Sequence, residues 1–358
     1  MVYLSFFEKK RRKVCRYEKK SYLCNRNRET NNVSRDAQMA ESVDALVSNT
    51  SGFTSIPVRP RVWVRNKEAG KVLMLFPLSF YTYLLCPLLM GTDIWQEIEV
   101  LNQEFVRLGI SQSVDYEKYY LYSLITHSTA IEGSTLTELD TQLLFDEGVT
   151  AKGKPLVYHL MNEDLKKAYE LAKEESAQNA EITPVFLQKL NAALMRTTGS
   201  VYNVMGGSFD SSKGEFRLCG VTAGVGGCSY MSYPKVPAKV EELCSILREK
   251  QKNMETFRER YELSFNAHLN LVTVHPWVDG NGRTARLLMN YIQFCHHLFP
   301  TKIFKEDRGD YILSLRQSQE DENSQPFLDF MAAQLKKSFA SEIEKYNTGR
   351  KKGFNLMF

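Results

Sequence analysis

The chain has 358 residues, of which 43% are hydrophobic and 25% charged, and its formal net charge is +4. This composition provides ample material for a core, which excludes a wholly disordered chain. The seven cysteines are odd in number, scattered and never spaced as C-x-x-C, so neither a disulfide framework nor a zinc site is indicated, and we expect a cytoplasmic protein.

The first 92 residues differ from the rest of the chain. Residues 1–71 contain 16 Lys and Arg against 7 Asp and Glu, with no helical or alternating apolar period. Such a basic run could contact nucleic-acid phosphates or an acidic membrane, or simply be solvated. Residues 72–90 are uncharged and long enough for a membrane anchor, but Pro77 and Pro87 would interrupt its helix. We therefore expect residues 1–92 to be a disordered leader or sequence upstream of the true start, with no nucleic-acid or membrane partner.

From residue 93 onward, apolar residues recur three and four positions apart, which predicts amphipathic helices. The predicted helices span 93–108, 116–131, 137–146, 155–173, 184–195, 238–254, 258–274, 283–296, 307–317 and 326–345. Residues 199–237 break the pattern with glycines, prolines and β-forming residues, and there we expect a short hairpin or mobile flap. The predicted fold class is all-α with one small β element. It divides into an N-terminal helical region at 93–180, a core domain at 181–340 and a tail at 341–358.

Residues 275–286, HPWVDGNGRTAR, contain a turn that suits a phosphate. The preceding helix is expected to end near Val274, and Gly280 and Gly282 lead into the next helix while letting an anion approach the backbone. The first N–H groups of a helix lack partners and its dipole is positive there, so this turn can bind an anion. The side chain of Asn281 can add a further donor.

Four ionisable side chains complete this stretch. Arg283 and Arg286 lie three residues apart on one helix face and can bind further phosphates. Asp279 is the only acid of the stretch and suits Mg²⁺, which would take its other ligands from phosphates and water. His275, with an ordinary pKa of about 6.5, can take a proton from a hydroxyl at neutral pH. Each feature alone is also common at helix ends, but together they predict a magnesium–polyphosphate site with a general base.

The same stretch resembles the signature of Fic (Fido) domain proteins, H-x-F-x-[DE]-G-N-G-R-x-x-R. Proteins of this family are all-helical enzymes that mostly transfer AMP from ATP to a hydroxyl side chain of another protein. The resemblance implies one role for each matching residue: His275 as the base, Asp279 as the magnesium ligand, Gly280, Asn281 and Gly282 as the anion hole, Arg283 as a phosphate-positioning residue and Arg286 as the γ-phosphate clamp. Trp277 stands where phenylalanine is usual, and an aromatic residue there preserves the anchoring role.

Residues 128–133, STAIEG, resemble the inhibitory motif of the same family, [S/T]-x-x-x-E-[G/N]. The resemblance implies that Ser128, Glu132 and Gly133 form this motif and that Glu132 pairs with Arg286. A carboxylate on that guanidinium would block the γ-phosphate or misalign the α-phosphate for attack. In some relatives the glutamate instead orients a water that removes AMP from the target, so both activities stay open. Without the downstream motif, Ser128 and Glu132 would be interpreted as a surface serine and a helix-end acid.

Two further segments resemble the target and nucleotide sites of the family. The flap would bind the target as an added strand through main-chain hydrogen bonds. Its residues expected over the nucleotide are Val221, Thr222, Ala223, Gly224, Val225 and Gly226. Tyr311, within EDRGDYILSL, is a candidate for the border of the adenine, and Gln319 is a second one. The alternative for Tyr311 is simple core packing, because Ile312 stands where some relatives have another tyrosine.

Other kinds of site find no support in the sequence. It contains no phosphate-binding loop of the G-x-x-x-x-G-K-[ST] type, no dinucleotide motif and no H-E-x-x-H zinc motif. His127, His159 and His268 have no metal-binding partners at a suitable spacing, and we expect them to be packing or surface residues.

The sequence thus predicts a self-inhibited protein adenylyltransferase that uses Mg·ATP. Its partner would be a target protein with an exposed Ser, Thr or Tyr hydroxyl, its own chain included, and a homo-oligomer is compatible with this activity. The first alternative is a hydrolase that removes AMP from the same target, or a transferase of another phosphate-containing group. The second is a nucleotide-gated binding module without turnover, against which the intact His275 and Asp279 count.

Overall fold

A computed structural model gives the structure of residues 93–223 and 229–354, with side chains described to residue 349. The leader expected at 1–92, the anchor considered at 72–90 and three flap residues lie outside the described residues; the three are Gly224, Val225 and Gly226.

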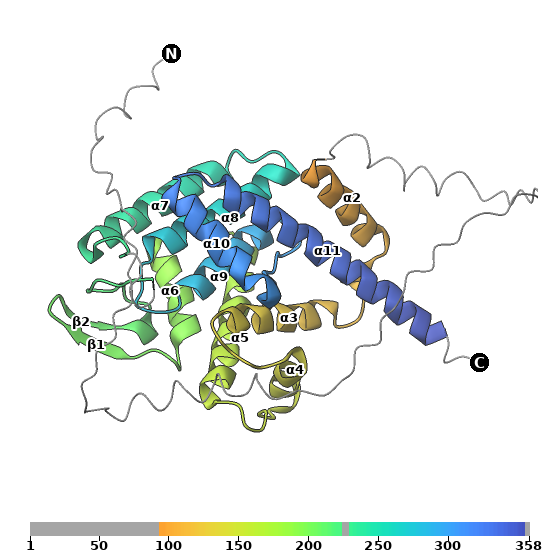
Figure 1. Ribbon diagram of the computed structural model, residues 1–358, viewed down its shortest axis with the longest axis horizontal. Coiled ribbons are helices and arrows are strands. Elements are labelled where there is room, and N and C mark those ends of the chain that lie inside the picture. The colour runs from red at the N-terminus through yellow and green to blue at the C-terminus, as the bar shows by residue number, and fades with distance from the viewer. Residues whose placement is uncertain (1–92, 224–228, 355–358) are drawn as a thin grey trace, which may run out of the picture. The chain divides into compact units, whose positions relative to one another are not determined.

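Helices make up most of the described structure (Figure 1). The described part of the chain contains ten α-helices and one two-stranded antiparallel sheet. The helices are α2 (Ile94–Arg107), α3 (Tyr116–Ile131), α4 (Glu138–Glu147), α5 (Leu156–Ala177), α6 (Pro184–Met195), α7 (Val236–Gln251), α8 (Phe257–Val274), α9 (Asn281–Cys295), α10 (Arg308–Glu320) and α11 (Gln325–Phe354). The predicted helices agree with these bounds to within a few residues, except that α11 continues well past its predicted end. The expected all-α fold class is confirmed.

Helix α9 lies at the centre of this arrangement and contacts α3, α5, α6 and α8 (Figure 1). Nearly every residue of α9 up to Gln293 is buried, including Arg283 and Arg286 at its start. A helix buried on all sides is usually apolar, because an unpaired charge in the interior is unfavourable. The two arginines therefore indicate that the amino end of α9 is built for a purpose other than packing.

Helix α8 delivers the chain to that same point. It begins with a capping box, in which the Glu259 N–H donates to the Thr256 hydroxyl at 3.2 Å and the Thr256 N–H donates to the Glu259 carboxylate at 2.9 Å. At its other end, α8 packs along α9 and leads directly into residues 275–280. The end of one buried helix and the start of another thus meet at the candidate site.

The two strands lie in the first part of the expected range of 199–237, before its glycine-rich residues. Strand β1 (Val201–Val204) pairs with β2 (Gly207–Asp210), with Val204 opposite Gly207. The turn depends on its glycines, because a Cβ on Gly206 would stand 2.3 Å from the Leu218 carbonyl oxygen. In the flap itself, the described residues form one isolated bridge, Thr222 with Ser229. The hairpin expected within 199–237 therefore lies at 201–210, and the described residues on the two sides of the flap are joined by this bridge.

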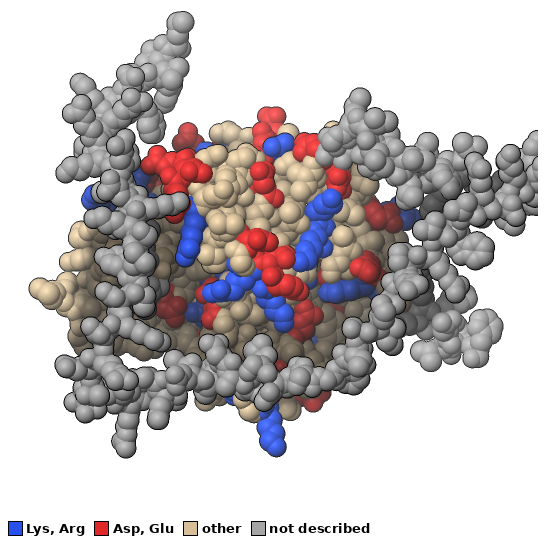
Figure 2. Space-filling model, viewed as in Figure 1, with Lys and Arg blue, Asp and Glu red and all other residues tan. Residues whose placement is uncertain are grey.

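The surface of the described part mixes charges of both signs. On the face shown in Figure 2, Lys and Arg side chains lie beside Asp and Glu side chains over much of the surface. Several of these contacts join separate elements, as where Lys337 of α11 pairs with Asp307 at 2.6 Å. Among the described helices, none combines the length and the apolar character that a membrane span requires.

Candidate active site

Two left-handed residues shape the loop that joins α8 to α9. His275 ends α8 with φ 52° and ψ 62°, and its N–H still donates to the Leu271 carbonyl at 3.0 Å. Gly280 precedes α9 with φ 80°. A non-glycine residue in this conformation costs on the order of 1 kcal/mol, so surrounding contacts must hold His275 in place.

Reciprocal hydrogen bonds between Trp277 and Asn281 close the loop. The Trp277 N–H donates to the Asn281 side-chain oxygen at 3.0 Å, and the Asn281 amide donates to the Trp277 carbonyl at 2.9 Å. The loop itself thus uses one N–H of the Asn281 amide, and donation of the second N–H to a ligand stays a prediction. Trp277 is fully buried and its indole N–H donates to the Gly214 carbonyl at 2.9 Å. The tryptophan thus anchors the loop and adds a hydrogen bond that phenylalanine could not make.

The start of α9 is open to an anion. Its amino end has no side-chain cap, so the N–H groups of its first residues have no partner within the helix. Both glycines of the turn are required by space: a Cβ on Gly280 would stand within 3.0 Å of Met195, Asn191 and Leu194. A Cβ on Gly282 would stand 2.7 Å from a carboxylate oxygen of Glu132.

Arg286 is surrounded by the end of α3. Its side chain is 3% exposed, and its Nε donates to the Ser128 hydroxyl at 2.8 Å. Its Nη2 donates to the Ser128 carbonyl at 3.0 Å and to the Glu132 carboxylate at 2.6 Å. The structure thus brings together the three residues that the sequence motifs linked. Gly133 follows directly with φ 101°, where the chain turns away from the site.

The carboxylate of Glu132 lies beside the start of α9. It lies over Gly282 at the start of α9 while it pairs with Arg286. Burial acts to raise the pKa of Glu132, but the positive charges of Arg286, then Arg283 and Arg308, outweigh it and the pKa is lowered. An ionised carboxylate is therefore held where the helix end and the arginines would receive a phosphate.

Arg283 keeps two donors available at the same place. It is 3% exposed, and its Nη2 lies 3.4 Å from both carboxylate oxygens of Asp279. Its Nε and Nη1 are buried without a hydrogen-bond partner among the described residues. Since buried donors are nearly always paired, two unpaired ones on one guanidinium indicate a missing anionic ligand.

Asp279 suits a magnesium ion whose other ligands are substrate phosphates and water. Its side chain is 62% exposed, and one oxygen accepts from the Gly280 N–H at 2.6 Å. Elsewhere in the described residues, no group of three or more His, Cys, Asp and Glu side chains could hold a metal. Magnesium binds readily to one carboxylate together with substrate phosphates and water, so the donor set suits Mg²⁺ with a polyphosphate.

His275 is held neutral at the beginning of residues 275–286, the stretch called the cradle from here on. Burial lowers its pKa to about 4, and Arg217 acts in the same direction, against the opposing effect of the Val272 carbonyl 3.3 Å from Nδ1. If Nδ1 carries the proton toward that carbonyl, Nε2 is free to accept one. Tyr230 stacks on the imidazole with ring centroids 3.7 Å apart. Sequence reasoning missed both Arg217 and Tyr230, which lie between β2 and α7 and meet His275 only in the folded chain.

Comparison with known proteins identifies the part of the chain that carries this geometry. Residues 181–293 match the family model described as Fic/DOC family. The chain contains a Fic domain. The match includes the whole of residues 275–286 but ends before α10, and it begins after α3.

Relatives of this Fic domain support the same assignment. The chain is 30% identical over 222 residues to a protein adenylyltransferase Fic of Drosophila grimshawi, which covers 60% of this chain and 41% of the relative. The chain therefore spans about two fifths of the length of that relative. Two solved structures share the fold. A Fic domain containing signaling protein from Bacteroides thetaiotaomicron has TM-score 0.58 and 24% identity, covering 69% of this chain and 96% of its own. Fic-1 from C. elegans has TM-score 0.59 and 22% identity, covering 76% of each chain.

Behind the Fic cradle, α10 supports Arg286 through Tyr311. The Tyr311 hydroxyl lies 3.4 Å from Arg286 Nη1 and 3.1 Å from His268 Nε2, and its ring is 2% exposed. Core packing and contact with Arg286 are thus both present, whereas contact with adenine stays a prediction. Gln319 donates to the Thr273 hydroxyl at 3.0 Å near the end of α8.

His268 is more than the packing residue we expected. It is fully buried on α8, and burial followed by the charge of Arg286 lowers its pKa well below its usual value. The neutral ring positions Tyr311, which in turn contacts Arg286. The available signal was its position on α8, seven residues and thus about two helical turns before His275.

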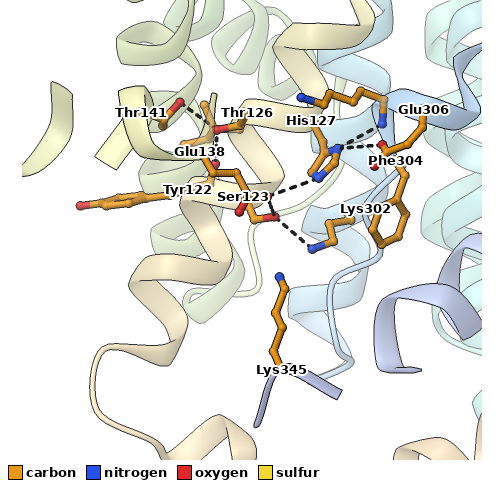
Figure 3. A network of polar contacts seen from close by, with 12 residues as sticks. Tyr122, Ser123, Thr126, His127, Glu138, Thr141, Lys302, Phe304, Glu306 and Lys345 are labelled. Atoms are coloured by element: carbon orange, nitrogen blue, oxygen red, sulfur yellow. Dashed lines mark hydrogen bonds and ion pairs between the residues drawn. The ribbon is translucent and has the colours of Figure 1, made fainter. Parts of the chain in front are cut away.

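A polar network holds the helix that carries Ser128 and Glu132 (Figure 3). The Ser123 hydroxyl donates to Glu138 at 2.7 Å and accepts from Lys302 at 3.0 Å. Lys302 has a side chain only 1% exposed and also pairs with Glu342 of α11 at 3.4 Å. These bonds tie the middle of α3 to α4, to the segment before α10 and to α11.

His127, directly before Ser128, takes part in the same network (Figure 3). Its Nε2 lies 3.3 Å from Glu138, and its Nδ1 accepts from the Lys305 N–H at 3.1 Å. Contact with His127 is the largest cause that lowers the pKa of Glu138 to about 2. His127 therefore fixes α3 through polar contacts as well as packing. His159, which lies on α5, accepts a hydrogen bond from the Ala151 N–H.

Proposed function

We propose that this protein is a self-inhibited protein adenylyltransferase, which transfers AMP from Mg·ATP to a Ser, Thr or Tyr hydroxyl of a target protein. The observation that carries the proposal is the carboxylate of Glu132 on Arg286, inside an otherwise open anion site. A phosphate would meet the same groups in its place. The name of the Drosophila relatives supports AMP transfer as the reaction.

The triphosphate would bind where α9 begins. The open N–H groups of the first turn and the two unpaired donors of Arg283 suit the α- and β-phosphates. Arg286 suits the γ-phosphate once Glu132 has left its guanidinium. Asp279 would hold a magnesium ion, which neutralises charge on the phosphates and on the departing pyrophosphate.

His275 would act as the general base. Its lowered pKa keeps it neutral at pH 7, so Nε2 can accept the proton of the target hydroxyl. As that proton leaves, the hydroxyl oxygen forms a bond to the α-phosphorus, and the bond between the α-phosphorus and the bridging oxygen to the β-phosphate breaks. The products are the adenylylated target and pyrophosphate. The described stem of the flap, from Val221 to Ala223, stands beside this site and would receive the target chain.

Inhibition follows from competition for one guanidinium. The ionised Glu132 carboxylate holds Arg286 at 2.6 Å, and a γ-phosphate cannot occupy the same position. Without a contact between its γ-phosphate and Arg286, ATP would bind with its α-phosphate turned away from His275. The chain would therefore bind or turn over ATP poorly until α3 or Glu132 moves.

Radioactive ATP tests the proposal and separates its alternatives. The Glu132→Gly protein, incubated in native lysate with ATP labelled in the α-phosphate, should retain label on protein, whereas γ-label should not be retained. Retention of γ-label would instead support phosphoryl transfer, and release of AMP from a modified target would support the hydrolase. Binding of ATP with no label retained in any arm would support the binding module. The cytoplasmic location, the target and the oligomeric state stay predictions.

A further inference from the structure

Arg217 is a fully buried arginine outside the recognised motif. It is 1% exposed and lies in the segment between β2 and the flap. Its main-chain N–H donates to the Pro276 carbonyl at 3.0 Å, so this segment runs directly beside the loop of residues 275–280. A buried guanidinium is unfavourable unless its N–H groups are hydrogen-bonded, so its partners show what the Arg217 side chain holds.

Those partners are three main-chain carbonyls from three separate points of the chain. The Nε of Arg217 donates to the His275 carbonyl at 2.8 Å. Its Nη1 donates to the Cys219 carbonyl at 2.8 Å, and its Nη2 donates to the Met231 carbonyl at 2.5 Å. A planar guanidinium directs its donors at fixed angles from three separate nitrogens, whereas the three donors of an ammonium group all belong to one compact nitrogen.

Cys219 and Met231 are the two ends of the flap. Between them, Thr222 bridges to Ser229, and the Tyr230 N–H donates to the Val221 carbonyl at 3.0 Å. Both strands of the flap stem are therefore attached to the guanidinium that also holds His275. The stacking of Tyr230 on the imidazole at 3.7 Å adds a direct contact between stem and ring.

We infer that Arg217 is a positioning residue, which fixes the candidate base His275 and both ends of the flap as one rigid unit. The role in AMP transfer rests on the proposed function. A target chain bound along the flap would then present its hydroxyl at a set distance from Nε2. Because a misplacement of about 1 Å can lower a rate by about 100-fold, loss of this link should reduce transfer far more than nucleotide binding. The cradle residues that would bind phosphates have no contact with the Arg217 side chain in the hydrogen bonds of the described residues.

The charge of Arg217 gives a second, independent readout. Burial is the main cause that lowers the pKa of His275, and Arg217 lowers it further, while the Val272 carbonyl, Glu132 and Asp279 act to raise it. Removal of the Arg217 charge should therefore raise the pKa of His275. A residue that only filled space would leave this titration unchanged.

The experiment compares Arg217→Met and Arg217→Lys, each in the Glu132→Gly protein of full length. Three quantities are measured: the rate of transfer from α-labelled ATP, the affinity for Mg·ATP by calorimetry, and the midpoint of the His275 imidazole titration by NMR, assigned with His275→Ala. We expect Arg217→Met to lower the rate by about 100-fold with ATP affinity nearly unchanged, and to move the His275 midpoint to higher pH. Arg217→Lys should keep the charge, hence the midpoint, but lose much of the rate, because a compact ammonium cannot reach all three carbonyls that surround the planar guanidinium.

Arg248→Met is the matched control. Arg248 also donates to a main-chain carbonyl, that of Ile182 at 3.1 Å, but it lies on α7 away from His275. It should lose stability with no change in the midpoint or rate. The inference is overturned if Arg217→Met folds and keeps both the transfer rate and the His275 midpoint of the parent. If Arg217→Met does not fold, the inference is overturned when Arg217→Lys keeps the transfer rate of the parent. If the Glu132→Gly parent shows no AMP transfer, the proposed function fails, while the NMR midpoint of Arg217→Met still decides the link to His275.

Discussion

The cradle at residues 275–286 and the end of α3 meet at one guanidinium, but they are built in opposite ways. The loop of the cradle is closed by contacts within the same twelve residues: Trp277 and Asn281 form hydrogen bonds with each other, and Gly280 precedes the first residue of α9. The end of α3 is held by residues from distant parts of the chain, and Glu132 is separated from Arg286 by 154 positions. The cradle is therefore a fixed feature of the Fic domain, whereas the contact that we propose to be inhibitory depends on where α3 is placed.

Under the proposed function, the cradle carries out AMP transfer and the end of α3 regulates it. Changes within the cradle should abolish or weaken the reaction, because no other part of the chain can replace its geometry. Changes around α3 should release the reaction, because they weaken the competitor of the γ-phosphate and leave the cradle intact.

Removal of the base should have the largest effect. In the Glu132→Gly protein, His275→Ala should lower transfer from α-labelled ATP by about 10² to 10⁴-fold, the usual contribution of general base catalysis. The control is His297→Ala, which changes an exposed histidine of the same region of sequence. Label retained at the parent level by His275→Ala would remove the histidine from the mechanism.

Distortion of the cradle should be the next largest effect. Gly280→Ala places a Cβ at φ 80° and within 3.0 Å of three side chains, so we expect a loss of about 1–3 kcal/mol in the free energy of unfolding. Chemical denaturation measures this loss, and calorimetry should show weaker ATP binding. Gly309→Ala serves as the control, because no atom lies within 4 Å of its added Cβ and its φ is ordinary. Equal stability of the two variants would contradict the account of the turn.

Loosening of α3 should have a smaller effect of opposite sign on activity. Ser123→Ala removes the hydroxyl that joins Glu138 to Lys302, without touching the cradle. A buried hydrogen bond contributes on the order of 1 kcal/mol, so we expect transfer by the otherwise unchanged protein to rise several-fold. Ser176→Ala on α5, whose hydroxyl bonds only to the Lys173 carbonyl among the contacts of the described residues, is the control. A rate equal to that of the control would show that the network does not hold the inhibited state.

The smallest effect is that of moderate acid on the rate. With a pKa of about 4, His275 keeps about nine tenths of its neutral form at pH 5, so transfer by the Glu132→Gly protein should hardly fall between pH 7 and pH 5. Loss of the Glu132 charge lowers the pKa further and acts in the same direction. The rate should fall only as the pH drops through the pKa. A fall centred at about pH 6.5 would show that burial does not control this histidine.

The sequence predicted the parts of the molecule that are local. Apolar periodicity located the helices, and the cradle was recognisable because its residues are contiguous. Glu132 could be linked to Arg286 only through the family motif, since nothing near either residue indicates the other. The hairpin at 201–210 lies within the expected range of 199–237, but its position in that range could not be predicted, because four-residue strands have too short an alternation to stand out.

The residues that were missed act through tertiary contacts. Arg217 binds main-chain carbonyls, which every residue possesses, so no pattern of side chains could have revealed its partners. His268 and Tyr311 meet only because α10 packs near α8. The bond from the Asn281 amide to the Trp277 carbonyl was not foreseen either, since a sequence shows which donors exist but not which of them the loop uses.

The most direct test of the central claim compares Mg·ATP with Mg·ADP as ligands for proteins with and without Glu132. Both proteins carry His275→Ala, so that no turnover occurs, and calorimetry measures each affinity. If Glu132 competes with the γ-phosphate for Arg286, Glu132→Gly should tighten ATP binding by about tenfold or more relative to its effect on ADP, as expected for a freed charge-assisted hydrogen bond. An equal change for both nucleotides, or no change for ATP, would contradict the account.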